Sequence, residues 1–179
     1  SLVRAGLLPR LVRPHQIEGV AACRWCIVDP RKGDGSPLTA LVHALCAPEV
    51  LGDAFAGFGV EPMLLKRSLE AEPELAVGQV RAALQGLTRA IQADTGETNA
   101  TARLMVVVDP LEPVFDAADP APFAAALQAL ADSGVAWVVA VLRSDHLCHL
   151  PRLGKLARQI HLELALELFE AAPLGLGHH

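Results

Sequence analysis

The amino-acid sequence predicts a three-layer α/β domain built around a mainly parallel β-sheet. Residues 103–109 and 135–142 contain continuous apolar runs rather than an alternating pattern, which is typical of strands buried on both faces. Residues 120–131, which lie between them, have the composition of a helix with two prolines in its opening turn. Two buried strands joined by a helix form a right-handed parallel crossover.

The first part of the chain predicts a helix, a strand and a second helix. Residues 2–11 place their apolar side chains largely on one side of a helix. Residues 19–28 predict a strand that ends at an Asp-Pro pair. Ser36 suits the N-cap and Pro37 the first turn of a helix over residues 38–46.

The middle and the end of the chain contain further helical segments. Residues 48–67 predict short helices broken at three glycines, and residues 72–93 have the apolar spacing of one long helix. Residues 94–100 are polar and predict a surface loop. Residues 150–170 predict mixed helix, with a short strand at 160–164.

Length and composition indicate one globular domain. The chain has 179 residues, of which 52% are hydrophobic, and a mean hydropathy of +0.35, so it can bury a sizeable core. Four cysteines in a chain of this size do not indicate a disulfide framework. Residues 124–142 are apolar, but Asp132-Ser-Gly134 predicts a helix, a turn and a strand rather than a membrane span. No signal peptide is recognisable, and we expect a cytoplasmic protein with no membrane partner.

The charge pattern gives no clear nucleic-acid footprint, because the net charge is −5. Six basic residues nevertheless stand among the first 32, against two acidic ones. They are Arg4, Arg10, Arg13, Arg24, Arg31 and Lys32, with Glu18 and Asp29. This stretch could face phosphate, and the alternative is solvated helix and loop charge.

Asp109 is the first candidate functional residue. It follows an apolar strand at its carboxyl end, and ligands bind at that edge of open parallel sheets. A carboxylate there can hold Mg²⁺ through water, and Glu112 is close enough to help position an attacking water. The alternative is structural, because an Asp-Pro pair is a common turn.

Arg143 is the second candidate, since it ends the next buried strand. If the two strands are neighbours, Arg143 and Asp109 lie at the same edge of the sheet. A cation there can contact a terminal phosphate and sense its hydrolysis. The alternative is an arginine paired with Asp145.

Other chemistry has weaker support. Cys23, Cys26, His43 and Cys46 match a loose zinc spacing, but residues i and i+3 of a strand point to opposite faces, so the first two would diverge. Buried apolar thiols are the alternative. An unrelated α/β hydrolase using Asp109, Asp145 and His146 lacks a plausible nucleophile in the sequence.

Together these segments resemble one family, the NTPase domain of the STAND class (signal-transduction ATPases with numerous domains), in its bacterial novel STAND branch. That family's phosphate loop (Walker A), G-x-S-G-S-G-K-S, continues as S-L-V-R-A-G-L-L-P, and this chain begins Ser1-Leu-Val-Arg-Ala-Gly-Leu-Leu-Pro9. Residues 17–26 and 36–45 resemble the segments that follow. Val106–Phe115 resembles the acidic strand L-V-V-D-Q-x-E-E-L-F, and Val141–His146 resembles the sensor strand T-L-R-S-D-F.

The resemblance covers residues 1–157 as a P-loop NTPase core and leaves residues 158–179 as a poorly matching tail. It implies that Asp109 assists Mg²⁺ in a Walker B role, Glu112 serves the hydrolytic water and Arg143 is the sensor. It also implies an ATP-driven signalling switch, joined to other domains and able to self-assemble. The first strand and phosphate loop are expected just before Ser1, so these 179 residues are expected to bind ATP weakly or not at all.

Two departures from the family pattern support an alternative function. Pro110 replaces a polar residue beside Asp109, and Pro113 replaces the second acid. A degenerate module, which keeps the fold for protein–protein contacts and has lost hydrolysis, would tolerate both changes.

Overall fold

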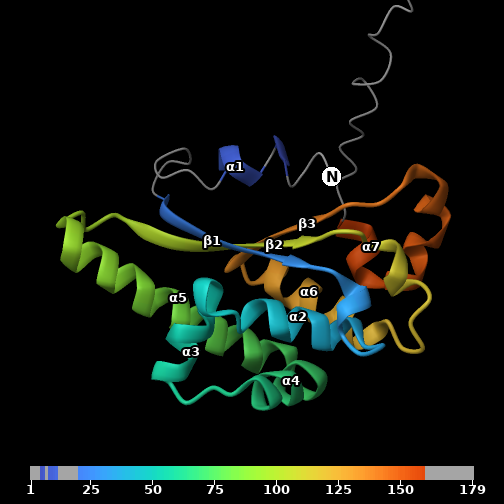
Figure 1. Cartoon of the computed structure of the whole chain (residues 1–179), viewed down its shortest axis with the longest axis horizontal. Helices are drawn as coiled ribbons and strands as arrows, with labels where there is room; N and C mark the ends of the chain where they lie inside the picture. The colour runs from blue at the N-terminus through green and yellow to red at the C-terminus, as the bar shows by residue number, and fades with distance from the viewer. Residues whose placement is uncertain (1–4, 7, 12–19, 160–179) are drawn as a thin grey trace, which may run out of the picture.

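The computed structural model describes residues 5, 6, 8–11 and 20–159. Its sheet consists of three parallel strands in the order β1-β2-β3, which are Val20–Val28, Thr101–Val108 and Ala136–Ala140. The prediction of an α/β domain with a parallel sheet is confirmed. Figure 1 shows that most helices lie on one face of the sheet and that α1 lies on the other.

The helical segments follow the predicted order. They are α1 (Leu8–Leu11), η2 (Pro30–Lys32), α2 (Pro37–Leu45), η3 (Pro48–Gly52), α3 (Asp53–Gly57), α4 (Pro62–Ala71), α5 (Pro73–Thr95), η4 (Glu112–Val114), α6 (Ala121–Asp132), η5 (Ser144–Leu153) and α7 (Lys155–Gln159). Helices α2, α5 and α6 contact the strands directly, and α4 packs against all three of these helices. The predicted helix over residues 2–11 falls partly outside the described residues, as does the predicted strand at 160–164.

Local interactions that the sequence predicts stabilise the loop from β1 into α2. Ser36 Oγ accepts a hydrogen bond from the Thr39 N–H at 3.4 Å, and Pro37 occupies the first turn, as predicted. Gly33 is required in this loop, because a Cβ atom there would lie 2.0 Å from the Ser36 carbonyl oxygen. The loop therefore has a fixed course, and η2 is held at the end of β1.

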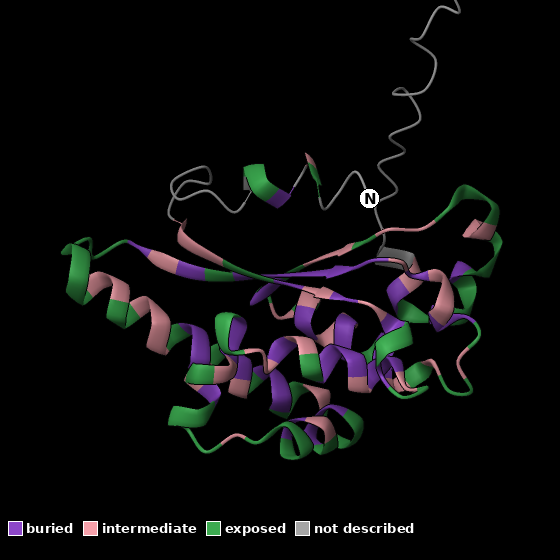
Figure 2. Cartoon of the chain, viewed as in Figure 1, coloured by how far each residue is buried: buried purple, intermediate pink, exposed green. Residues whose placement is uncertain are grey.

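Strand β2 is the centre of the core. Leu104, Val106 and Val108 face the helices and are fully buried. Met105 and Val107 face the opposite side and are also buried, in a cluster with Leu8. The prediction that this apolar run is buried on both faces is confirmed, and Figure 2 shows the buried residues concentrated between sheet and helices. Each such side chain contributes about 1.5–3 kcal/mol relative to exposure.

Strand β3 differs from its prediction. It is shorter than residues 135–142, and it is not fully buried, since Trp137 is 37% exposed. Within the described part of the chain β3 pairs only with β2, so it is an edge strand there. An apolar run in the sequence predicts a strand, but it does not predict how many other strands that strand pairs with.

The sheet face opposite the helices carries both tryptophans of the chain. Trp25 pairs in register with Met105, and Met105 pairs with Trp137. Register partners on adjacent strands share a face, so these three side chains form one row across the sheet. Both tryptophans flank the buried methionine and are themselves partly exposed.

The apolar segment at residues 124–142 forms α6, a turn at Gly134 (φ 67°) and β3, as predicted. Among the described residues no single helix is long and apolar enough to cross a membrane. One bent pair, Pro37–Leu45 with Pro48–Gly57, meets the length and composition requirement.

Candidate functional site

The three strands end together at one edge of the sheet. Val28 pairs with Val108, and Val108 pairs with Ala140. The ladder continues past the strands, because the Asp109 N–H donates to the Val28 carbonyl at 3.0 Å and the Val141 N–H donates to the Val108 carbonyl at 2.9 Å. Residues that follow the strands are therefore held side by side.

Asp109 follows the central strand and is only 6% exposed. Its peptide bond to Pro110 is cis. The next residue, Leu111, donates its N–H to the Val141 carbonyl at 2.9 Å, which ties the segment after β2 to the segment after β3. The carboxylate thus sits in a fixed frame at the carboxyl edge, where open parallel sheets bind ligands.

Glu112 lies at the start of η4 and bridges the two strand ends. Its Oε1 atom accepts a hydrogen bond from the backbone N–H of Arg143 at 2.9 Å. Its Oε2 atom is buried and has no hydrogen-bond partner within the described residues. A buried carboxylate oxygen without a partner is costly, and such an atom marks a place where a water or a cation would be stabilised.

Arg143 lies at the same edge as Asp109, because β2 and β3 are neighbours. Its Nη2 atom is 2.7 Å from Asp145 Oδ2, and its side chain is 73% exposed. The pairing is the structural alternative that the sequence raised. The guanidinium is nevertheless at the surface, so it remains accessible to a ligand.

A second arginine, Arg31, lies at this edge, and the sequence singled it out only as one of six basic residues in a stretch that could face phosphate. Asp29 follows β1 directly, and Arg31 clasps it through Nε and Nη2, each at 2.8 Å, while the Arg31 N–H donates to Oδ1 at 3.2 Å. These hydrogen bonds lower the pKa of Asp29, against the opposing effect of burial. The repeated pattern of an apolar strand followed by Asp-Pro, at 29–30 and 109–110, was the signal that could have pointed to it.

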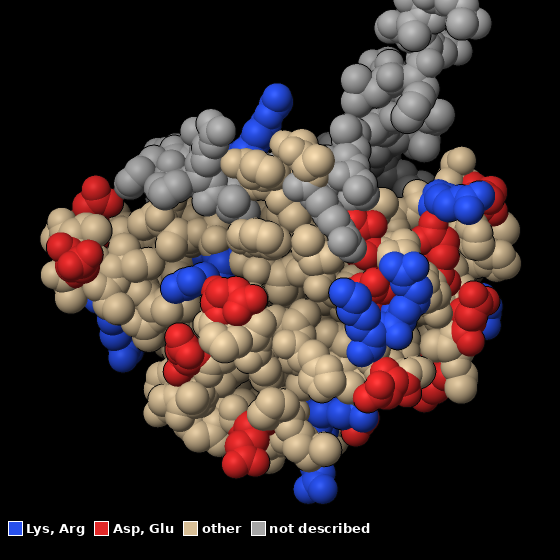
Figure 3. All heavy atoms as spheres, in the orientation of Figure 1, with Lys and Arg blue, Asp and Glu red and all other residues tan. Residues whose placement is uncertain are grey.

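Arg31 belongs to the same electrostatic environment as Asp109. The hydrogen bond to Asp29 raises the pKa of the Arg31 guanidinium most, and the charges of Asp29 and then of Asp109 add to this effect. Turn η2 also contacts η4, which contains Glu112. Figure 3 shows basic side chains beside acidic ones at the end of the molecule where β1 runs into α2.

The hydrolase residues do not form an evident triad. The Asp145 carboxylate is engaged by Arg143. The His146 ring neighbours the His149 ring at 5.7 Å, and His149 in turn faces Phe115 at 5.7 Å. An arrangement of Asp109, Asp145 and His146 thus stays a prediction from the sequence.

The cysteine pair diverges as the strand period requires. Cys26 packs in the core beneath the helices, and burial raises the pKa of its thiol to about 12. Cys23 packs on the opposite face against Met105 and Val107. The described residues contain no group of three or more His, Cys, Asp or Glu side chains placed to hold a metal ion.

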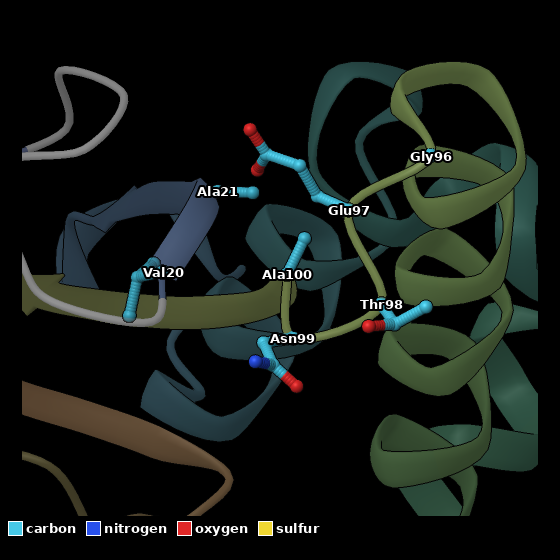
Figure 4. Close-up of a pocket in the computed structure, with 7 residues that line it drawn as sticks. All are labelled: Val20, Ala21, Gly96, Glu97, Thr98, Asn99 and Ala100. Carbon is cyan, nitrogen blue, oxygen red and sulfur yellow. The ribbon is translucent and has the colours of Figure 1, made fainter.

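The described residues line a cavity at the other end of the sheet. This cavity, drawn in Figure 4, has a volume of about 410 Å³ and is lined by Val20 and Ala21 with the loop Gly96–Ala100. These residues stand at the amino ends of β1 and β2, opposite the edge that holds Asp109. The cavity is therefore separate from the candidate site.

Comparison with known proteins identifies the family of the chain. Neither curated proteins nor solved structures gave a match. The model of one family, described as Novel STAND NTPase 1, matches residues 1–172. The three-stranded parallel sheet is consistent with the α/β fold of this family. The chain belongs to the Novel STAND NTPase 1 family.

Proposed function

We propose that this chain supplies the acidic and sensor residues of an Mg²⁺·ATP site in a STAND-type signalling switch. The observation that carries the proposal is the buried Asp109 at the carboxyl end of the central strand, followed three residues later by Glu112, whose buried Oε2 has no hydrogen-bond partner within the described residues. These oxygen ligands suit a hard cation that keeps several of its waters.

Each residue has a defined part in this site. Asp109 would accept hydrogen bonds from the waters around the metal and so fix its position. Glu112 would hold the attacking water with Oε2, since its Oε1 is occupied by the Arg143 N–H. Arg143 would exchange Asp145 for the terminal phosphate. A magnesium ion, when bound, supplies positive charge that offsets the charge of the phosphates.

Nucleotide binding at this edge would be coupled to assembly. The segments after β2 and β3 are joined by two hydrogen bonds, from Leu111 to Val141 and from Arg143 to Glu112. A ligand that bound Glu112 or Arg143 would therefore shift the segments after β2 and β3 together. We place the domain in the cytoplasm, within a multidomain protein whose other parts receive the change.

One observation favours a second candidate function. Pro113 follows Glu112 in η4, and the carboxylate of Glu112 is already engaged by a backbone N–H. In a degenerate module this bond would simply brace the edge, and the domain would serve protein–protein contacts without hydrolysis.

The test begins with the coding sequence immediately upstream of Ser1, because these 179 residues contain no G-x-x-x-x-G-K-[ST] loop. If that loop is encoded, the full-length product should release phosphate from ATP, and Asp109→Asn should lower this rate on the order of 100-fold while Asp116→Asn, an exposed control, should not. Binding of ATP with no turnover in the wild type would support the degenerate module. No loop and no binding would overturn the proposal.

A further inference from the structure

The carboxyl edge of the sheet carries two arginine–aspartate pairs, one on each side of Asp109. Arg31 is paired with Asp29 after β1, and Arg143 is paired with Asp145 after β3. In both pairs the partners are two residues apart. Because β2 lies between β1 and β3, the buried carboxylate of Asp109 lies between the two pairs.

We propose that Arg31 is a second phosphate-binding residue of this site, acting from the side opposite Arg143. The inference rests on the proposed function, because it assigns a further ligand contact to the same nucleotide. The chemistry it would recognise is the polyphosphate chain of a nucleoside triphosphate.

Arg31 is held in position while its guanidinium faces solvent. The fork on Asp29 uses Nε and one N–H of Nη2, so three of its five side-chain N–H groups are left over. The Arg31 side chain is 64% exposed, whereas the Asp29 side chain that anchors it is 11% exposed. Such an arm is pre-organised for an anion, and planar arginine donors match phosphate oxygens well.

The backbone around Arg31 is fixed independently of this pair. The Lys32 N–H donates to the Asp29 carbonyl at 3.0 Å, and the Ser36 N–H donates to the Gly33 carbonyl at 2.8 Å. Gly33 lies in the same loop and packs closely against the backbone of Ser36 and Ala40, with no space for a Cβ atom. A ligand could therefore bind the remaining N–H groups of Arg31 without rebuilding the loop.

Acidic and basic side chains occupy different parts of this edge, which suits a cation at the centre and a phosphate at the flank. Asp109 and Glu112 supply buried or partly buried acid groups at the centre, suited to a cation. Arg31 supplies positive charge at one flank, and the charge of Asp109 reaches it. The exposed side of the Arg31 guanidinium is the part that a phosphate could reach.

The test measures binding of Mg²⁺·ATP and of AMP to the full-length protein by isothermal titration calorimetry. The variants are Arg31→Gln and Arg89→Gln. Arg89 is exposed on α5, so its variant is a control with the same change of charge. We expect Arg31→Gln to weaken ATP binding about 10-fold or more while AMP binding stays within twofold, since hydrogen bonds to charged groups are the stronger class. Arg89→Gln should leave both unchanged.

Three results would overturn the inference, and they are distinguishable. If the wild type binds no ATP, the proposed function fails and this inference fails with it. If the wild type binds ATP and Arg31→Gln behaves like Arg89→Gln, only the inference fails. If Arg31→Gln weakens ATP and AMP equally, Arg31 does not contact the terminal phosphates. Both variants should keep a cooperative thermal melt, with Arg31→Gln at most slightly below the wild type, which separates lost contact from lost fold.

Discussion

Strands β1 and β2 are followed by the same dipeptide, Asp-Pro, but the residues after it differ. Both strands run through valine into Asp-Pro, at Val28-Asp29-Pro30 and Val108-Asp109-Pro110. The residue after each Asp-Pro pair differs, Arg31 in one case and Leu111 in the other. Arg31 is exposed and forms an ion pair with Asp29, whose own side chain is 11% exposed, whereas Leu111 is buried and Asp109 is 6% exposed. The same dipeptide is thus followed by an exposed arginine in one place and by a buried leucine in the other.

Placing at position 111 the arginine that follows the first Asp-Pro pair should have the largest effect. Leu111→Arg would place a cation in a site where the leucine is 2% exposed, which we expect to cost about 3–5 kcal/mol of unfolding free energy. Urea denaturation followed by far-UV circular dichroism measures this. Leu111→Met, which keeps the volume, should cost less than about 1.5 kcal/mol. Equal stability of the two variants would show that Leu111 does not need an apolar side chain.

Replacing Asp109 and Asp29 by asparagine, one at a time, should lower ATP turnover by different amounts. Asp109→Asn is expected to lower ATP turnover of the full-length protein on the order of 100-fold, the scale of losing one transition-state contact. Asp29→Asn should lower it less, because Asp29 only anchors Arg31. Phosphate release at saturating ATP is the measurement. A larger loss at Asp29 would reverse the assignment of roles.

The loop that follows β1 allows a smaller test of how the first strand end is held. In Gly33→Ala the added Cβ meets backbone atoms of Ser36 and Ala40, so we expect a loss of about 1–3 kcal/mol. Gly35→Ala meets no atom within 4 Å and carries only the strain of its positive φ of 83°, about 1 kcal/mol. Thermal melts of the two variants compare them directly. A costlier Gly35→Ala would contradict the packing argument.

The smallest expected effect concerns pH. Hydrogen bonding from Arg31 holds the pKa of Asp29 below its ordinary value of 3.8. A depressed carboxyl pKa stabilises the folded state above that ordinary value, and the contribution is lost as pH falls through the folded pKa. The melting temperature of the wild type should therefore exceed that of Arg31→Gln slightly near pH 5, and the difference should vanish well below pH 3.8. A difference that grows on acidification would have the wrong sign.

Much of the fold could be predicted because its signals are local. The cap at Ser36 and Pro37, the long helix that became α5 and the buried run of β2 each depend on side chains within a few residues. The extent and burial of β3 were wrong because they depend on its neighbours in the sheet. Trp137 fits a strand pattern equally well at a centre or at an edge.

The site could be predicted only in outline. Parallel topology places the ends of neighbouring strands together, so Asp109 and Arg143 could be assigned to one edge. The bond from the Arg143 N–H to Glu112, the buried Oε2 of that residue and the fork of Arg31 on Asp29 depend on the course of loops between strands. No spacing in the sequence encodes those distances.

The row of Trp25, Met105 and Trp137 has a spectroscopic consequence. The chain contains two tryptophans and no tyrosine, so its near-ultraviolet fluorescence comes almost entirely from one face of the sheet. Both tryptophans are already partly exposed to solvent in the folded state, so the wavelength of their emission maximum should shift little on unfolding. The same emission is well placed to report any molecule that covers this face, and it reports such an event without an added label.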